Sequence, residues 1–90
     1  MGRREKIRSL YEKLGRSRNN VSFTDICTLA EMVGFTFDRQ GGSHKIYRHK
    51  NPPGIMDFQE VKGKAKPYQV KQLLDFIDDH DLINKEVPDV

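Results

Sequence analysis

The 90-residue sequence predicts a single α+β domain, in which helices cover one face of a three-stranded antiparallel sheet. Three observations predict this class. Apolar residues recur at helical spacing near both ends of the chain, apolar and polar residues alternate in the middle, and glycine- or proline-rich turns separate the alternating runs. Consecutive strands with short connections form an antiparallel meander, and helices pack on one side of it. The opposite face is expected to stay open.

The N-terminal third predicts two helices. The first covers residues 3–14, where apolar residues follow the i, i+3, i+4, i+7 rule: Ile7, Leu10, Tyr11 and Leu14. Ser22 suits the N-cap of a second helix, because Asp25 follows three residues later as in a capping box. Gly34 suits the C′ position that ends this helix.

Three strands are expected to follow, over residues 35–39, 43–49 and 55–61. The pair Gly41-Gly42 predicts a tight turn between the first two strands, because glycine adopts backbone conformations that other residues resist. Asn51-Pro52-Pro53-Gly54 predicts a loop before the third strand, whose Met56 and Phe58 are expected to face the core.

The C-terminal third predicts a basic loop and a last helix. Lys62 to Lys66 form the loop, and Pro67 suits the first position of a helix over residues 67–79. From about Asn84 the chain lacks a pattern, and residues 84–90 are expected to fray. Residues 1–90 then form one domain with a core over residues 21–83. The order α-α-β-β-β-α resembles the double-stranded-RNA-binding fold, α-β-β-β-α, with an extra N-terminal helix.

Charge is unevenly distributed along the chain, whose formal net charge is +3. Residues 39–71 hold eight Lys/Arg against two acids, whereas residues 72–90 hold one lysine against six acids. A basic centre followed by an acidic tail favours a polyanion-binding face that lies away from the C-terminal helix.

Composition restricts the remaining classes of function. Cys27 is the only cysteine, so an internal disulfide is excluded and a buried, inert thiol is expected. The sequence has no recognisable signal peptide and no apolar run of membrane-spanning length, so we expect a cytoplasmic protein without membrane contact. A chain of 90 residues has little room for a deep cavity, and no cofactor is expected.

The run from Gly41 to His49 carries the strongest candidate for chemistry. Its glycine pair puts His44 where a turn becomes a strand, so the side chain projects from a rigid support. Imidazole exchanges a proton near neutral pH. RNA is cleaved without a metal when a base removes the 2′-hydroxyl proton and cations stabilise the phosphorane. His44 is therefore the predicted general base, and the predicted RNA contacts in this region are Arg39, Ser43, Lys45 and Arg48.

The general acid and the open face of this strand stay undetermined. His49 and Tyr47 are both candidates to protonate the leaving 5′ oxygen. Alternation places His44 and Arg48 on one face. Lys45, Tyr47 and His49 share the other, and the pattern does not indicate which face is open. Because His44 and His49 project to opposite faces, no metal site is expected there.

Three lysines before the last helix form a second candidate site for anions. They lead into Pro67, and helix N-termini bind phosphate groups. The alternative interpretation is that these lysines only keep the loop soluble and bind no RNA. The predicted RNA contacts in this segment are Lys62, Lys64 and Lys66.

The motif Gly42-Ser43-His44, followed by Ile46-Tyr47-Arg48-His49, resembles the signature of HicA toxins, the mRNA interferases of HicAB toxin–antitoxin systems. The resemblance extends from about Ile26 to Ile77. It implies a double-stranded-RNA-binding-like fold and the role of toxin in a type II toxin–antitoxin system. It also implies a metal-independent endoribonuclease that cleaves mRNA with a catalytic histidine at His44. The implied partners are the mRNA substrate and a HicB-type antitoxin that blocks the active face.

Two features depart from the family's pattern. Typical members are shorter, and the helix over residues 3–14 is an addition. Many members also carry a proline and a histidine near the end of the third strand, where this chain has Asp57-Phe58-Gln59-Glu60. If that histidine assists cleavage in relatives, this chain either uses another group or is less active. A non-catalytic RNA-binding module on the same fold and a protein-interaction domain are the alternative functions.

Overall fold

The computed structural model describes residues 2–85 of the chain, and it confirms the predicted α+β fold. Helices precede and follow an antiparallel sheet, in the order expected from the sequence. The elements are α1 (Arg3–Arg16), α2 (Phe23–Met32), β1 (Thr36–Gly41), β2 (His44–His49), β3 (Gly54–Val61), β4 (Lys64–Ala65), α3 (Pro67–Asp79) and α4 (Leu82–Lys85).

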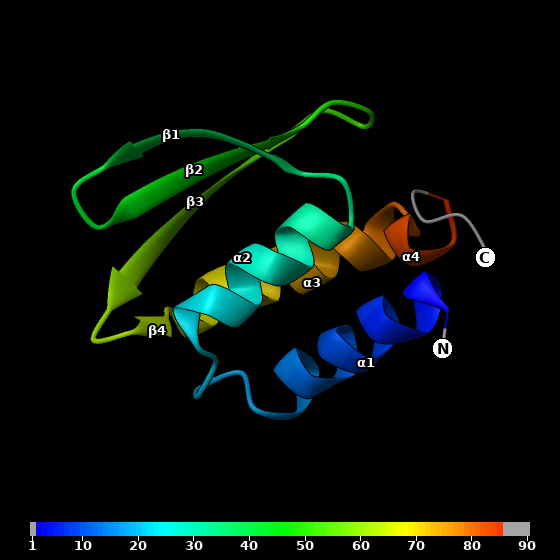
Figure 1. Ribbon diagram of the computed structural model, residues 1–90, viewed down its shortest axis with the longest axis horizontal. Helices are drawn as coiled ribbons and strands as arrows, with labels where there is room; N and C mark the ends of the chain where they lie inside the picture. Colours follow the sequence, from blue (N-terminus) through cyan, green and yellow to red (C-terminus); the bar gives the residue numbers. More distant parts are fainter. Residues whose placement is uncertain (1, 86–90) are drawn as a thin grey trace.

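The molecule is layered. Within residues 2–85 the sheet has the strand order β1-β2-β3-β4, and each neighbouring pair is antiparallel. Figure 1 shows the sheet along one side, α2 and α3 beneath it, and α1 on the far side of these two helices. One face of the sheet therefore packs on helices, and the other is left open.

Alternation along the strands decides which side chains enter the core. Tyr47 of β2 and both Met56 and Phe58 of β3 are buried on the helix side, as predicted for the two residues of β3. The core also takes its main apolar residues from all three long helices: Ile7, Leu14, Ile26, Leu29, Val70, Leu73 and Ile77.

Local signals in the sequence set the helix boundaries. The hydroxyl of Ser22 accepts a hydrogen bond from the backbone N–H of Asp25 at 3.1 Å, so the predicted N-cap of α2 is confirmed. Gly34 follows α2 with a φ of 106°, a left-handed conformation that glycine adopts without a steric penalty. Pro67 is the first residue of α3, as predicted.

The predicted basic loop over Lys62 to Lys66 contains a strand, which is a correction. Lys62 and Gly63 have φ values of 52° and 78° and form a two-residue turn that leads back into β4. The backbone N–H of Ala65 donates to the carbonyl of Val21 at 2.9 Å, and that of Phe23 donates to the carbonyl of Gly63 at 2.9 Å. These bonds tie the turn to the start of α2, a long-range contact that local sequence does not reveal.

The chain beyond α3 also differs from the expectation. Asn84, predicted to begin a frayed tail, lies in the short helix α4, whose Leu82 is buried in the core. The rest of the predicted tail, residues 86–90, lies outside the described residues. None of the described helices is long and apolar enough to cross a membrane.

Helix α1 is attached to the layer of α2 and α3 rather than to the sheet. Its Ile7 and Leu14 are buried, and Lys13 forms an ion pair with Asp25 of α2 at 3.0 Å. The Tyr11 hydroxyl donates to a carboxylate oxygen of Asp78 in α3. This hydrogen bond is the largest of the effects that raise the pKa of Tyr11 to about 12, so the phenol stays protonated and the attachment persists well above neutral pH.

Candidate active site

The open face carries three rows of side chains that run across β1, β2 and β3. Directly paired residues on neighbouring strands point to the same side, so the strand register defines each row. The three rows are Gly41-His44-Gln59, Arg39-Ile46-Asp57 and Thr36-Arg48-Ile55. The structure thus brings three of the predicted site residues, His44, Arg39 and Arg48, to one face.

His44 is held by a carboxylate. Its Nδ1 lies 2.7 Å from Oδ1 of Asp57, which belongs to the next row and the neighbouring strand. Both side chains stay accessible, with 43% of His44 and 54% of Asp57 exposed. An ionised Asp57 accepts a hydrogen bond from Nδ1–H, which leaves the lone pair of the imidazole on Nε2. In this tautomer Nε2 of His44 is able to accept a proton, and the side chain is accessible on the open face.

The turn between β1 and β2 fixes the backbone of His44. Gly42 has a φ of 59°, the left-handed conformation for which glycine is suited, and nothing lies within 4 Å of the Cβ that it lacks. His44 is the first residue of β2, as the glycine pair predicted. The carbonyl of Ser43 accepts from the N–H of Glu60 at 2.9 Å, so the turn is tied to β3.

Asp57 has its own support, which comes from Gln69 in the first turn of α3. The side chain of Gln69 is 4% exposed, and its Nε2 donates to the carbonyl of Asp57 at 2.6 Å. Its Oε1 accepts from the backbone N–H of Gln59 at 2.9 Å. The side-chain amide of Gln69 therefore makes the two backbone hydrogen bonds that a neighbouring strand would make at this edge of β3. Neither Asp57 nor Gln69 was among the predicted site residues.

We expect replacement of Gln69 by leucine to destabilise the fold by about 1–3 kcal/mol, because a buried donor and a buried acceptor lose their partner. Chemical denaturation followed by circular dichroism measures this loss. Gln72→Leu, at an exposed position of the same helix, is the matched control. Equal stability of the two variants would contradict the role given to Gln69.

Two arginines of the open face share one carboxylate. Asp38, at the β-bulge of β1, accepts from Nε of Arg48 at 2.9 Å and from a terminal nitrogen of Arg39 at 2.7 Å. The hydrogen bond from Arg48 is the largest of the effects that lower the pKa of Asp38. The carboxylate is thus ionised at neutral pH and holds two guanidinium groups on the same face as His44.

The other face of β2 is closed by the helices, which argues against both candidates for the general acid, Tyr47 and His49. Tyr47 is buried, its hydroxyl donates to Glu31 at 3.0 Å, and desolvation raises its pKa further above the ordinary value. His49 is buried with its ring nitrogens 2.8 Å and 3.1 Å from the carbonyl oxygens of Pro52 and Val33. Neither side chain can reach a substrate that lies at His44.

Lys45 also lies on the helix side, which separates it from His44. Its Nζ stands 5.8 Å from the centre of the Phe23 ring. The thiol of Cys27 is buried, and desolvation raises its pKa, which agrees with the predicted inert thiol. Among the described residues, His, Cys, Asp and Glu side chains do not gather in groups of three that could hold a metal ion.

The predicted lysines Lys62, Lys64 and Lys66 follow β3, the strand that pairs with the β2 strand of His44. Because β2 begins and β3 ends at the same end of the sheet, the turn at Lys62 lies on the side of the molecule where the Gly42 turn lies (Figure 1). Lys62 and Lys64 are exposed, and Lys66 is the N-cap residue of α3. These three lysines form a second group of cations between the end of β3 and the start of α3.

Comparison with models of protein families matches residues 23–78 to the HicA toxin of bacterial toxin–antitoxin systems. The match covers more than half of the chain and includes all four strands, while α1 lies outside it. No curated protein and no solved structure gives a significant match.

Proposed function

The chain belongs to the HicA toxin family, and we propose that it is a metal-independent endoribonuclease that cleaves mRNA with His44 as the general base. Membership makes it the toxin component of a toxin–antitoxin system. The observation that carries the proposed chemistry is the hydrogen bond of 2.7 Å between His44 and Asp57, on an open face that also holds two arginines.

In the proposed reaction, Nε2 of His44 removes the proton from a 2′-hydroxyl of the RNA. The 2′ oxygen attacks the adjacent phosphorus, the bond from phosphorus to the 5′ oxygen of the next nucleotide breaks, and that oxygen takes up a proton from solvent water. The products are a 2′,3′-cyclic phosphate and a 5′-hydroxyl end. Asp57 holds the imidazole in the tautomer that acts as a base and stabilises the imidazolium that forms.

The cations divide into two groups in this proposal. Arg39, in the row next to that of His44, stabilises the charge that develops on the phosphorane, and Ser43 lies beside His44 in the turn. Arg48 lies four residues from His44 along β2 and binds the RNA strand further along the open face. The turn lysines Lys62, Lys64 and Lys66 bind phosphates further along the strand. Lys45 faces the helices and is not assigned to the scissile phosphate.

The family also implies an antitoxin partner, and we propose that a HicB-type antitoxin covers the open face. Covering this face would remove His44, Arg39 and Arg48 from the substrate together. A single bound protein would then block catalysis and RNA binding at once.

Incubation of the purified protein with a long RNA in EDTA tests the proposed function. We expect fragments with 5′-hydroxyl ends, which polynucleotide kinase labels without prior dephosphorylation. A mock purification from cells that lack the protein controls for contaminating nucleases. RNA that is shifted on a gel but stays intact would instead support the alternative, a non-catalytic RNA-binding module on the same fold.

Replacing Asp57 by alanine should lower kcat roughly 10- to 100-fold with little change in KM, because the partner that orients a histidine has effects of this size. Asp57→Asn keeps the shape of the side chain but loses the negative charge that stabilises the imidazolium, so it should also lower kcat. Steady-state kinetics on a short RNA measures both parameters. A loss confined to KM would assign Asp57 to RNA binding instead of to His44.

Replacing Lys62, Lys64 and Lys66 together by alanine should make RNA binding less sensitive to salt. If each lysine neutralises one phosphate of a single strand, the slope of log K against log salt should fall by about 2. Fluorescence anisotropy at several salt concentrations measures this slope. An unchanged slope would favour the solubilising interpretation of these lysines.

A further inference from the structure

A hollow lies at the end of the open face that is opposite to the Gly42 turn. Its volume is about 530 Å³, and its lining includes Thr36, Arg48, Lys50, Pro53 and Ile55. These residues come from the starts of β1 and β3, the end of β2 and the loop that joins β2 to β3. The hollow therefore lies on the same face as His44 but is separate from the His44–Asp57 pair.

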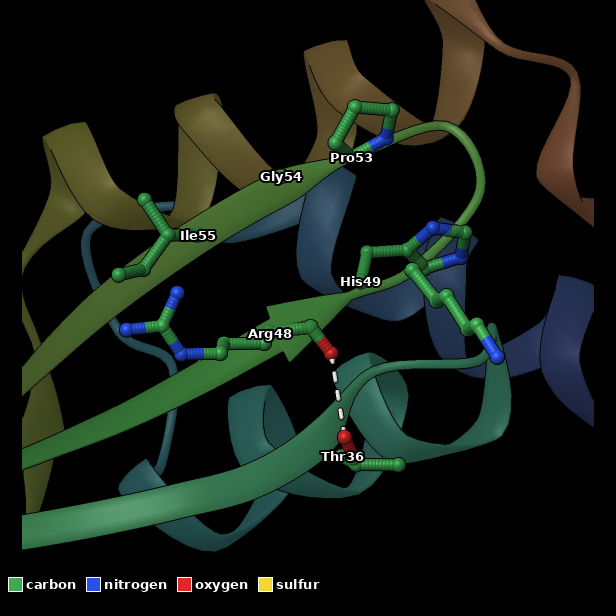
Figure 2. A pocket seen from close by; sticks show the side chains of 7 residues that line it. Thr36, Arg48, His49, Pro53, Gly54 and Ile55 are labelled. Atoms are coloured by element: carbon green, nitrogen blue, oxygen red, sulfur yellow. Dashed lines mark hydrogen bonds between the residues drawn. The ribbon is translucent and has the colours of Figure 1, made fainter.

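One wall of the hollow is apolar and exposed. Ile55 is 54% exposed, although it lies within a strand, and it pairs directly with Arg48 across the sheet. Figure 2 shows the guanidinium of Arg48 turned toward Ile55, with Pro53 in the loop just before the strand that carries Ile55. An aliphatic side chain thus lies next to a planar cation.

Arg48 is held in place from two sides. Its Nε donates to Asp38 at 2.9 Å, and its backbone carbonyl accepts from the hydroxyl of Thr36 at 3.4 Å (Figure 2). A guanidinium fixed by a carboxylate offers a flat surface on which a base stacks. The charged residues among those that line the hollow, Arg48 and Lys50, are cations, so the site suits a ligand with an apolar face and nearby negative charge.

We propose that this hollow receives one unpaired base of the RNA strand that is cleaved at His44, an inference that rests on the proposed function. The base packs against Ile55 and Arg48, and a neighbouring phosphate contacts Lys50. Arg48 is four residues from His44 along β2, a separation of about 13 Å. The base therefore lies at a short, fixed offset from the scissile bond.

The site also restricts the class of substrate. In a duplex both faces of a base are covered by its neighbours and its Watson–Crick edge is paired, so the base cannot enter a hollow between side chains. The substrate is therefore single-stranded at this position, and Ile55 and Arg48 contribute to the choice of cleavage site.

Binding of short single-stranded RNAs to the full chain carrying His44→Ala tests this inference without cleavage. The fluorescent base 2-aminopurine is placed at successive positions of the RNA. We expect its fluorescence to change at one position on binding. Adding Arg48→Ala or Ile55→Ala should remove that change and weaken binding roughly 10-fold, the effect of losing one stacked base.

Two matched variants serve as controls. Arg8→Ala removes an arginine from the exposed side of α1, and Val61→Ala shortens an exposed aliphatic residue of β3 outside the hollow. Neither should alter the fluorescence change. A change that persists in both Arg48→Ala and Ile55→Ala would overturn the proposed base site, as would equal binding of a duplex of the same sequence.

The outcomes separate this inference from the nuclease proposal. A position-specific change in a protein whose parent form does not cleave RNA would support the base site and refute the nuclease. Cleavage by the parent protein without any position-specific change would support the nuclease and refute the base site.

Discussion

Replacing His44 by alanine should lower the rate of RNA cleavage by roughly 10²- to 10⁴-fold, the usual contribution of a general base. The variant loses the only imidazole that the described residues present on the open face, and Asp57 cannot replace it because a carboxylate is a much weaker base. The fold should persist, since His44 is 43% exposed and its single hydrogen bond joins two accessible side chains. Single-turnover cleavage of a short labelled RNA measures the effect.

His80→Ala is the matched control for this experiment. His80 caps the C-terminus of α3, where its ring lies 4.5 Å from that of Phe76, and it takes no part in the open face. The His80→Ala variant should cleave RNA at the parental rate. RNA binding by His44→Ala should also stay close to that of the parent, because the arginines and lysines are unchanged. Parental cleavage rates in His44→Ala would remove His44 from the proposed mechanism.

Replacing Leu14 by alanine should destabilise the protein by about 2–5 kcal/mol, although Leu14 lies outside the range that matches the family. Leu14 is 1% exposed in the contact between α1 and the other helices, so the truncation leaves a cavity in the core. In a domain of this size each kcal/mol corresponds to a fall in Tm of roughly 4–8 °C. Thermal unfolding followed by circular dichroism measures the shift.

The same variant also tests whether α1 serves stability alone. Below its Tm, Leu14→Ala should cleave RNA at the parental rate, because α1 packs on the far side of α2 and α3 from the sheet (Figure 1). Glu12→Ala, at an exposed position of the same helix, should change neither property. Loss of activity in a folded Leu14→Ala protein would instead couple α1 to the open face.

Elements whose signals are local could be predicted from the sequence. The cap at Ser22, the glycine at position 34 and the proline at position 67 each act on their own turn of helix, so their effects do not depend on the rest of the chain. The strand β4 could not be predicted, because the bond of Ala65 to Val21 and the bond of the preceding turn residue Gly63 to Phe23 join segments that are distant in sequence.

The candidate site could be predicted only in part, for a related physical reason. The turn at Gly42 identified His44 as the first residue of a strand, but its partner Asp57 depends on the register between β2 and β3. Register is set by the packing of one complete face, which alternation within one strand does not describe. The departure from the family's pattern at Asp57-Phe58-Gln59-Glu60 was the available signal, because it pointed to the segment that supplies the carboxylate.

Tyr47 and His49 illustrate the same limit. Alternation grouped them correctly on one face, yet aromatic hydroxyls and imidazoles occur both in protein cores and at active sites. Their bonds to Glu31, Val33 and Pro52 decide the question, since these acceptors come from α2, the end of α2 and a loop.

The place of α1 has a practical consequence for single-molecule work. A biotin or a flexible linker joined ahead of Arg3 would attach the protein to a glass surface through the layer that is furthest from the sheet. The open face would then point into solution, free to capture a labelled RNA or to be covered by an antitoxin. Arrival, cutting and inhibition could thus be watched on one immobilised molecule without altering any residue of the open face.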